Sequence, residues 1–143
     1  MFDRYMILTR GFKNVKQGGS ITGFQLDVRI TYYRGIPLSC VEGFDITVDG
    51  ETFTMDKIKY SIGNRIYTPA EAESATTVRW PFGDALTLII NKPGGLKPGI
   101  HEVQVLQRLR ISYHPDPAKP GDRITGSENP SVHTDKKRMT LAA

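Results

Sequence analysis

The sequence has almost no cysteine and no long hydrophobic run. Its one cysteine, Cys40, excludes an internal disulfide framework and a cysteine-rich zinc site. No stretch approaches the roughly 20 apolar residues that a membrane-spanning helix needs. The first residues, from Met1 to Tyr5, do not begin the pattern of a secretory signal peptide, in which a basic segment precedes an apolar one. We therefore expect a soluble, cytoplasmic protein.

An excess of charge of one sign is also absent. The 143 residues hold 19 Lys and Arg against 15 Asp and Glu, a net charge of +4 with histidine neutral. This balance gives no support to nucleic acid as the main ligand.

Chemically active side chains are few and scattered. The three histidines, His101, His114 and His133, do not lie at metal-ligand spacing. No nucleophile stands beside a base in a known pattern, and Cys40 is interpreted as a small buried hydrophobe. We expect His101 to be solvated or packed at a corner of the fold. The residues therefore predict no catalytic group, metal or other cofactor in this chain, and they favour a subunit or binding module.

Period-two alternation of apolar and polar residues dominates the sequence. Four apolar residues share one face of the segment 24–31. They are Phe24, Leu26, Val28 and Ile30. Side chains alternate across a β-strand, so this segment is typical of a half-buried strand. Residues 44–48 and 102–113 alternate in the same way, although Gln107 breaks the second pattern, and residues 85–91 are typical of a buried strand.

Turn chemistry divides these strands. The dipeptide Asp49-Gly50 between two β-forming runs predicts a tight hairpin, because both turn residues must adopt positive φ. Residues 61–67 are a weaker hairpin candidate. Eight or nine short strands with turns roughly every 8–12 residues favour an all-β, antiparallel β-sandwich of immunoglobulin-like or jelly-roll-like type. Residues 96–105 resemble the corner of such sandwiches, where Leu96 plugs the end of the core.

The sequence also predicts one short helix and a separate tail. Thr68, Pro69 and Glu71 form a capping box that starts a helix near residue 69 and ends it near Ser74. Composition changes at residue 114. We therefore expect residues 1–114 to form the sandwich and residues 115–143 to be an extended or disordered C-terminal tail outside the core.

Two clusters are candidates for a subunit interface or a pocket wall. Tyr32 and Tyr33 are adjacent, so on a strand they point to opposite faces and one is presented outward beside Arg34, as in interface hot spots. The alternative is a strand end in which one tyrosine caps the core. The second cluster contains Arg79 and Trp80. Trp80, the one tryptophan, either plugs the core or faces a partner or ligand.

Several stretches become specific when they are taken together and in order. They are residues 1–7 (MFDRYMI), 10–15 (RGFKNV), 23–25 (GFQ), 32–39 (YYRGIPLS), 41–44 (VEGF), 48–51 (VDGE), 92–96 (KPGGL) and 109–113 (LRISY). In this combination the chain resembles the small (beta) subunit of bacterial C-glycoside deglycosidases. The similarity covers residues 1 to about 114, and the tail adds no support.

The resemblance implies a function that the residues alone do not define. It implies a TIM-barrel large (alpha) subunit as partner, with a divalent metal, Mn or Mg, in that large subunit. It also implies lyase-type cleavage of the C–C bond between a sugar and an aromatic aglycone such as a flavonoid. The sugar is first oxidised to a 3-keto sugar, and the 3-keto C-glycoside binds at or near the interface. The catalytic motif lies on the large subunit, so no catalytic residue is transferred to this chain. A stand-alone carbohydrate-binding sandwich and an oligomerisation module are the alternative functions.

Overall fold

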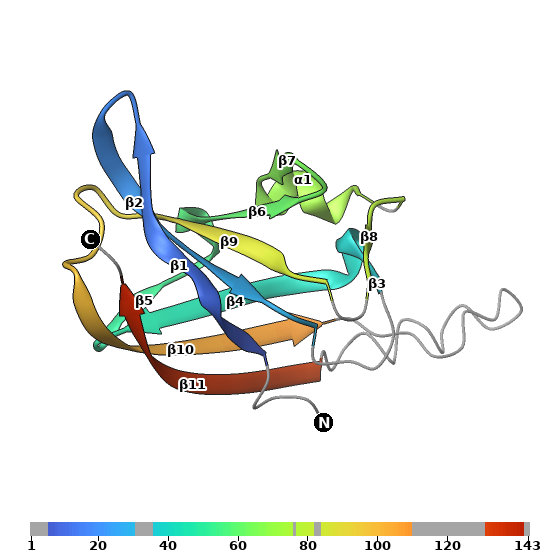
Figure 1. The fold of residues 1–143 in the computed structure, drawn as a ribbon. Coiled ribbons are helices and arrows are strands. Elements are labelled where there is room, and N and C mark those ends of the chain that lie inside the picture. The colour runs from blue at the N-terminus through green and yellow to red at the C-terminus, as the bar shows by residue number, and fades with distance from the viewer. Residues whose placement is uncertain (1–5, 31–35, 76, 82–83, 110–130, 142–143) are drawn as a thin grey trace, which may run out of the picture.

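Two antiparallel sheets pack face to face in the computed structural model, which describes residues 6–30, 36–75, 77–81, 84–109 and 131–141 (Figure 1). The five-stranded sheet comprises, in spatial order, β1 (Ile7–Gln17), β2 (Ser20–Val28), β9 (Leu86–Asn91), β6 (Ile58–Ile62) and β7 (Arg65–Tyr67). The four-stranded sheet comprises β11 (Ser131–Leu141), β10 (Gly99–Leu109), β4 (Val41–Val48) and β5 (Glu51–Phe53). A two-stranded ribbon joins β3 (Ile36–Pro37) to β8 (Arg79–Trp80). The predicted all-β antiparallel sandwich is confirmed.

The core lies between the two sheets and follows the predicted alternation. Phe24, Leu26 and Val28 of β2 are fully buried, as is Ile30 just beyond the strand. Aromatic rings join the two layers edge to face. The ring of Phe24 on β2 lies 5.4 Å from that of Phe53 on β5, and the ring of Phe44 on β4 lies 5.7 Å from that of Tyr60 on β6. These perpendicular contacts hold the sheets at a fixed separation.

Both predicted hairpins are present. Asp49 and Gly50, between β4 and β5, have φ angles of 48° and 91°. Gly63 and Asn64, between β6 and β7, have φ angles of 59° and 64°. Positive φ at both turn positions matches the right-handed twist of the flanking strands, so these short turns close the hairpins without splaying them.

The helical content is small. α1 (Pro69–Glu73) starts at the predicted capping box, in which the Thr68 hydroxyl accepts from the Glu71 backbone N–H and the Glu71 carboxylate accepts from the Thr68 N–H. The two short 3-10 turns are η2 (Leu38–Cys40) and η3 (Met55–Lys57). No helix among the described residues is long and apolar enough to cross a membrane.

The prediction of a tail outside the core is wrong for residues 131–141. They form β11, which pairs with β10 along its whole length, from Ser131 opposite Leu109 to Leu141 opposite Gly99. Met139 is 3% and Leu141 1% exposed, so both belong to the core. Backbone hydrogen bonds to β10 and two apolar anchors compensate for the low apolar content that suggested a tail. Residues 115–130, also assigned to the tail, lie outside the described residues.

Polar side chains on the inner face of β11 bind the start of β1, which belongs to the other sheet. Asp135 is 8% exposed, and one of its carboxylate oxygens accepts from the Ile7 backbone N–H at 3.0 Å. The Lys137 ammonium donates to the Ile7 carbonyl at 2.7 Å. These two side chains take the place of a strand neighbour for the start of β1. These hydrogen bonds explain why Asp135 and Lys137, two charged residues of β11, face inward.

Gln107 does not break the pattern of β10, contrary to the expectation from sequence. Its side chain points inward between Val105 and Leu109 and is completely buried. Its amide nitrogen donates to the Arg29 carbonyl at 3.2 Å. A buried polar group is tolerated when it is hydrogen-bonded, so an amide can occupy an inward position. Ile111 and Tyr113 of the same predicted alternation lie outside the described residues.

Candidate functional site

The β3–β8 ribbon carries the second cluster that the sequence marked as an interface candidate. Ile36 lies opposite Trp80 and Pro37 opposite Arg79. The chain after β3 is held to the segment before β8 by a backbone hydrogen bond from Leu38 N–H to the Val78 carbonyl, at 2.7 Å. α1 packs against the neighbouring turn η2. The ribbon is therefore fastened to the sandwich on both of its strands.

Trp80 is a core residue. Its ring is completely buried and lies 6.3 Å from the ring of Phe44 on β4. The indole N–H donates to the Asp84 carbonyl at 3.0 Å, which satisfies its one polar group. Of the two interpretations of Trp80, its burial supports the core plug, and the ring offers no surface to a partner.

Arg79 is the one interface candidate whose side chain the structure describes as exposed. It precedes the buried Trp80 on β8 and faces the other side of the ribbon, because successive strand residues face opposite sides. Tyr32, Tyr33 and Arg34, the first cluster, lie outside the described residues. Their contribution to an interface or pocket wall stays a prediction.

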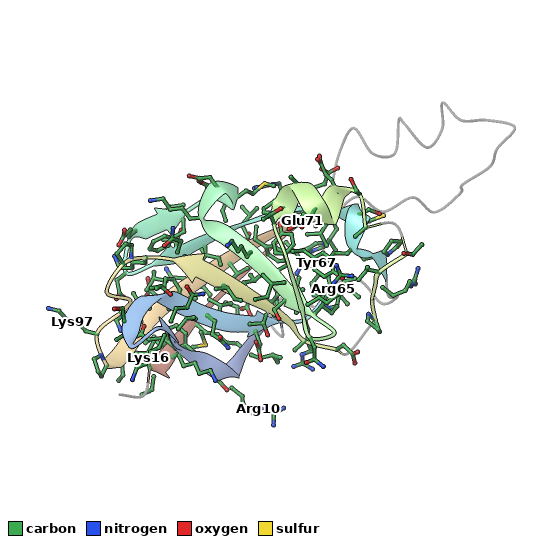
Figure 2. The ribbon with its side chains drawn as sticks, turned by 90° about the horizontal axis from the view of Figure 1, so that it is seen from above. Arg10, Lys16, Arg65, Tyr67, Glu71 and Lys97 are labelled. Carbon is green, nitrogen blue, oxygen red and sulfur yellow. The ribbon has the colours of Figure 1, made fainter. Side chains whose placement is uncertain are left out.

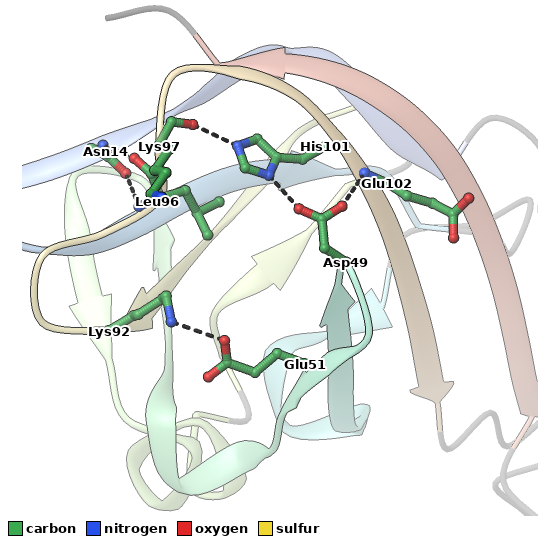
Figure 3. A network of polar contacts seen from close by, with 8 residues as sticks. All are labelled: Asn14, Asp49, Glu51, Lys92, Leu96, Lys97, His101 and Glu102. Carbon is green, nitrogen blue, oxygen red and sulfur yellow. Dashed lines mark hydrogen bonds and ion pairs between the residues drawn. The ribbon is translucent and has the colours of Figure 1, made fainter.

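The corner between β9 and β10 is held by a network of side-chain hydrogen bonds (Figure 3). Leu96 enters the core here, as the corner pattern predicted, and is 9% exposed. The side chain of Asn14 on β1 forms hydrogen bonds with both backbone groups of Leu96. The Asn14 amide donates to the Leu96 carbonyl at 2.8 Å, and its carbonyl oxygen accepts from the Leu96 N–H at 2.9 Å. The side chain of Asn14 thus substitutes for a strand partner and fixes where the chain passes between the sheets.

His101 completes this corner, in agreement with the corner-packing interpretation. Its Nδ1 lies 2.6 Å from the Asp49 carboxylate, and its Nε2 lies 2.6 Å from the Lys97 carbonyl. Burial lowers the His101 pKa, but the hydrogen bonds to Lys97 and Asp49 and the Asp49 charge outweigh it, so the pKa lies above its usual value. Both ring nitrogens face acceptors, so the geometry favours the imidazolium form.

Asp49 is held in its ionised form by the same contacts. Its other oxygen accepts from the Glu102 backbone N–H at 2.9 Å. That hydrogen bond, followed by the one from His101, lowers the pKa of Asp49 below its usual value. The corner joins the hairpin turn between β4 and β5 to the start of β10. These contacts hold the two segments together, and both ring nitrogens of His101 take part in them.

Other potential ligands are dispersed. Within the described ranges, no group of three His, Cys, Asp or Glu side chains is placed to hold a metal ion. Cys40 is partly buried against the core. His133 lies on β11, far along the chain from His101, and His114 falls outside the described residues.

An ion pair on the outer face of the four-stranded sheet was not predicted from the sequence. Arg108 on β10 binds both carboxylate oxygens of Asp45 on β4, at 2.9 and 3.3 Å. This pairing, against the effect of burial, raises the Arg108 pKa. Tyr60 is buried with no hydrogen-bond partner for its hydroxyl among the described residues, and burial raises its pKa to about 12. Asp45 and Arg108 come from two different strands, so no short motif in the sequence could show their pairing.

Comparison with known proteins decides the family. The family model of the C-glycoside deglycosidase beta subunit matches residues 2–113. The chain belongs to this family. A C-glycoside deglycosidase beta subunit of Eubacterium cellulosolvens is 34% identical over 79% of this chain and 78% of the relative. A 3'-dehydrocarminate deglycosidase beta subunit of a Microbacterium species is 32% identical over 84% of each chain. A C-glycoside deglycosidase beta subunit of Arthrobacter globiformis is 33% identical over 62% of this chain and 67% of the relative.

The family assignment confirms the resemblance seen in the sequence. The matched range contains every strand from β1 to β10 and ends before β11. It also contains both interface clusters and the His101 corner. The chain is therefore a sandwich in which the matched part is completed by one further strand, β11.

Proposed function

We propose that this chain is the small, non-catalytic or pocket-completing subunit of a heteromeric C-glycoside deglycosidase. In this proposal the large subunit is a TIM barrel that holds a divalent metal, Mn or Mg. The substrate is a 3-keto C-glycoside of a flavonoid or another aromatic aglycone. The observation that carries the proposal is membership of a family of beta subunits over residues 2–113. One relative is named for 3'-dehydrocarminate, which agrees with an oxidised substrate.

The proposed reaction is a β-elimination. A keto group at the sugar 3-position makes the neighbouring C2 hydrogen acidic, because the anion formed is an enolate. A base of the large subunit removes that proton, and the metal stabilises the developing charge on oxygen. The enolate electrons then form the C1–C2 double bond. The aglycone leaves C1 with the electron pair of the broken C–C bond and takes up a proton.

The small subunit would act by shaping the pocket and excluding water from it. A rigid wall keeps the reacting groups aligned and removes competing solvent. The β3–β8 ribbon suits such a wall because the buried Trp80 anchors it while Arg79 stays exposed. We include Tyr32, Tyr33 and Arg34 in the same wall as part of the proposal.

Reconstitution of the complex tests this function. The chain alone, the large subunit alone and the two co-expressed are each assayed with a 3-keto C-glycoside and with the unoxidised C-glycoside as control. We expect turnover only by the complex and only of the keto substrate. A large subunit that is as active alone as in the complex would contradict a pocket-completing role. Tight sugar binding by the isolated chain would support the carbohydrate-binding alternative instead.

A further inference from the structure

A groove crosses the outer face of the five-stranded sheet. Its volume is about 410 Å³, and its lining includes Val15 of β1, Ile66 of β7 and Ile89 of β9. Lys57 and Lys59 also line it. The β1–β2 hairpin stands on one side of this face, and β7 with α1 stands on the other (Figure 1). The groove is therefore an open channel with apolar side chains along it and lysines beside them.

Strand register explains this arrangement. Lys59 lies opposite Ile89, Ile89 opposite Gln25, and Gln25 opposite Lys13. Directly paired residues on neighbouring strands point to the same face of a sheet, so these four side chains form one row across the outer face. In this row Ile89 lies between Lys59 of β6 and Gln25 of β2, and Lys13 of β1 lies beyond Gln25.

The lysines of this face have no acidic partner within the sheet. Lys13, Lys57 and Lys59 form no ion pair among the described residues. Of the neighbouring acids, Asp27 accepts a hydrogen bond from the Thr87 hydroxyl at 2.7 Å, and Asp56 accepts one from the Thr54 hydroxyl at 2.6 Å. Both carboxylates keep their negative charge, and Asp56 lines the groove beside Lys57, so it offsets part of the lysine charge without forming an ion pair. The ammonium groups of Lys57 and Lys59 can still form ion pairs with another molecule.

At the β7 side, charge is partly balanced within the chain. Arg65 lies over the ring of Tyr67, 5.3 Å from its centre, and both are close to Glu71 of α1 (Figure 2). Hydrogen bonds from the Thr68 backbone and hydroxyl, followed by the charges of Arg65 and Lys59, lower the pKa of Glu71. The charge of Lys59 is therefore partly balanced by Glu71, and Lys57 in the groove and Lys13 across the sheet add further positive charge to this face.

The outer face of the four-stranded sheet is built differently. Two ion pairs form within this face, Arg108 with Asp45 at 2.9 Å and Lys136 with Glu102 at 3.2 Å. Its exposed apolar residues are separate: Ile100 lies opposite Thr140 at one end of the β10–β11 ladder, and Val132 lies towards the other end. In contrast, Ile66, which is 58% exposed, shares one groove with Ile89 and Val15. An apolar groove with unpaired cations is the composition of a docking surface, whereas a face with internal ion pairs is suited to solvent.

We propose that the groove on the five-stranded sheet docks the large subunit through an apolar ridge edged with carboxylates. This inference rests on the proposed function, since it names the face on which the partner sits. The apolar part of the ridge would cover Ile66, Ile89 and Val15, and the carboxylates would pair with Lys57 and Lys59. α1 packs beside β7 and η2, so the surface continues from the groove towards the β3–β8 ribbon and Arg79.

A matched pair of charge reversals in the co-expressed complex tests this assignment. The variant Lys57→Glu/Lys59→Glu reverses the groove, and Lys136→Glu/Arg138→Glu makes the same change in net charge on the outer face of the four-stranded sheet. We expect association with the large subunit to weaken at least about 30-fold for the first variant and less than about 3-fold for the second. The neutral variant Lys57→Gln/Lys59→Gln should lie between, with a shallower dependence on salt than the wild type. Thermal midpoints of the free subunits show that each variant is folded.

The other results overturn the assignment, each in a recognisable way. Equal weakening by both reversals, or by neither, would show that the groove is not the docking face. If Ile66→Ser weakened association while the lysine reversal did not, the carboxylate-edged partner would be wrong. If the wild-type chain formed no complex with the large subunit, the proposed function would fail, and the docking face would fail with it. A wild-type complex that is active but insensitive to the groove variants would overturn the docking face alone.

Discussion

Truncation of Met139 tests whether β11 belongs to the folded core. Met139 is 3% exposed on the inner face of β11 and lies opposite His101 of β10. Met139→Ala removes a buried thioether and leaves a cavity beside the corner of the sandwich. Its neighbour Thr140 points outward and is exposed, so Thr140→Ala changes the same strand without touching the core.

The expected loss follows from burial and from the position of the strand. Truncation of a fully buried large side chain to alanine costs about 2–5 kcal/mol. β11 is the last strand of its sheet, so the surroundings can close partly around the cavity, and we expect the lower half of that range, about 2–3 kcal/mol. For a domain of this size, such a loss lowers the thermal midpoint by roughly 10 °C. Thr140→Ala should change the free energy of unfolding by no more than about 0.5 kcal/mol.

Urea and thermal unfolding of the two variants and the wild type measure these values. Equal m-values across the series would show that the denatured states are comparable, so that midpoint differences report stability. Should Met139→Ala and Thr140→Ala agree within about 0.5 kcal/mol, the inward packing of β11 would be refuted. Residues 131–141 would then be a tail, as their composition first suggested.

Further predictions concern the corner, the sheet and the ribbon. The pKa of His101 is raised in the folded chain, so its contribution to stability is complete below the usual pKa of 6.5 and is lost as the pH rises through the raised pKa. The pKa of Asp49 is lowered, so its contribution is present above the usual pKa of 3.8 and is lost as the pH falls below that pKa. The difference in thermal midpoint between wild type and His101→Gln should therefore be larger at about pH 5 than at about pH 9, and equal differences would contradict the imidazolium form. Asn14→Ala should lower stability by about 1–3 kcal/mol in urea unfolding, because it leaves two backbone groups of the corner without a partner. Gly23→Ala should fail to give a folded subunit by circular dichroism, since a Cβ there would overlap the backbone carbonyl oxygen of Ile90 on β9. Arg79→Ala should keep the midpoint of the free subunit but weaken association or turnover roughly 30-fold; an unchanged complex would remove Arg79 from the interface.

Local chemistry was sufficient to predict the turns and the helix. A residue pair such as Asp49-Gly50 determines its own φ angles, and the capping box of Thr68 and Glu71 satisfies its own backbone groups. Neither depends on what lies far away in the chain. The alternation in β2 was equally informative because its consecutive residues alternate between apolar side chains for the buried face and polar side chains for the solvated face. Family membership, likewise, followed from residues that the sequence displays in order.

The candidate site was only partly predictable for a related reason. The sequence placed Arg79 and Trp80 together, but burial of the tryptophan depends on Phe44, which is contributed by a different strand. The groove on the five-stranded sheet depends on register, which brings Lys59, Ile89 and Lys13 into one row although they come from three strands. No short segment contains that row, so no motif could show it.

What the sequence by itself determined is the β-rich class, the hairpins and the helix start, since each follows from neighbouring residues. Only the tertiary structure decided that residues 131–141 are a strand. Their inward positions hold Asp135 and Lys137, which composition assigns to solvent. Asp135 is buried and Lys137 half-buried here because the backbone of Ile7, more than a hundred positions earlier in the chain, supplies their hydrogen-bond partners. A contact between such distant segments exists only after the chain has folded, and it reverses the preference of the side chains that make it.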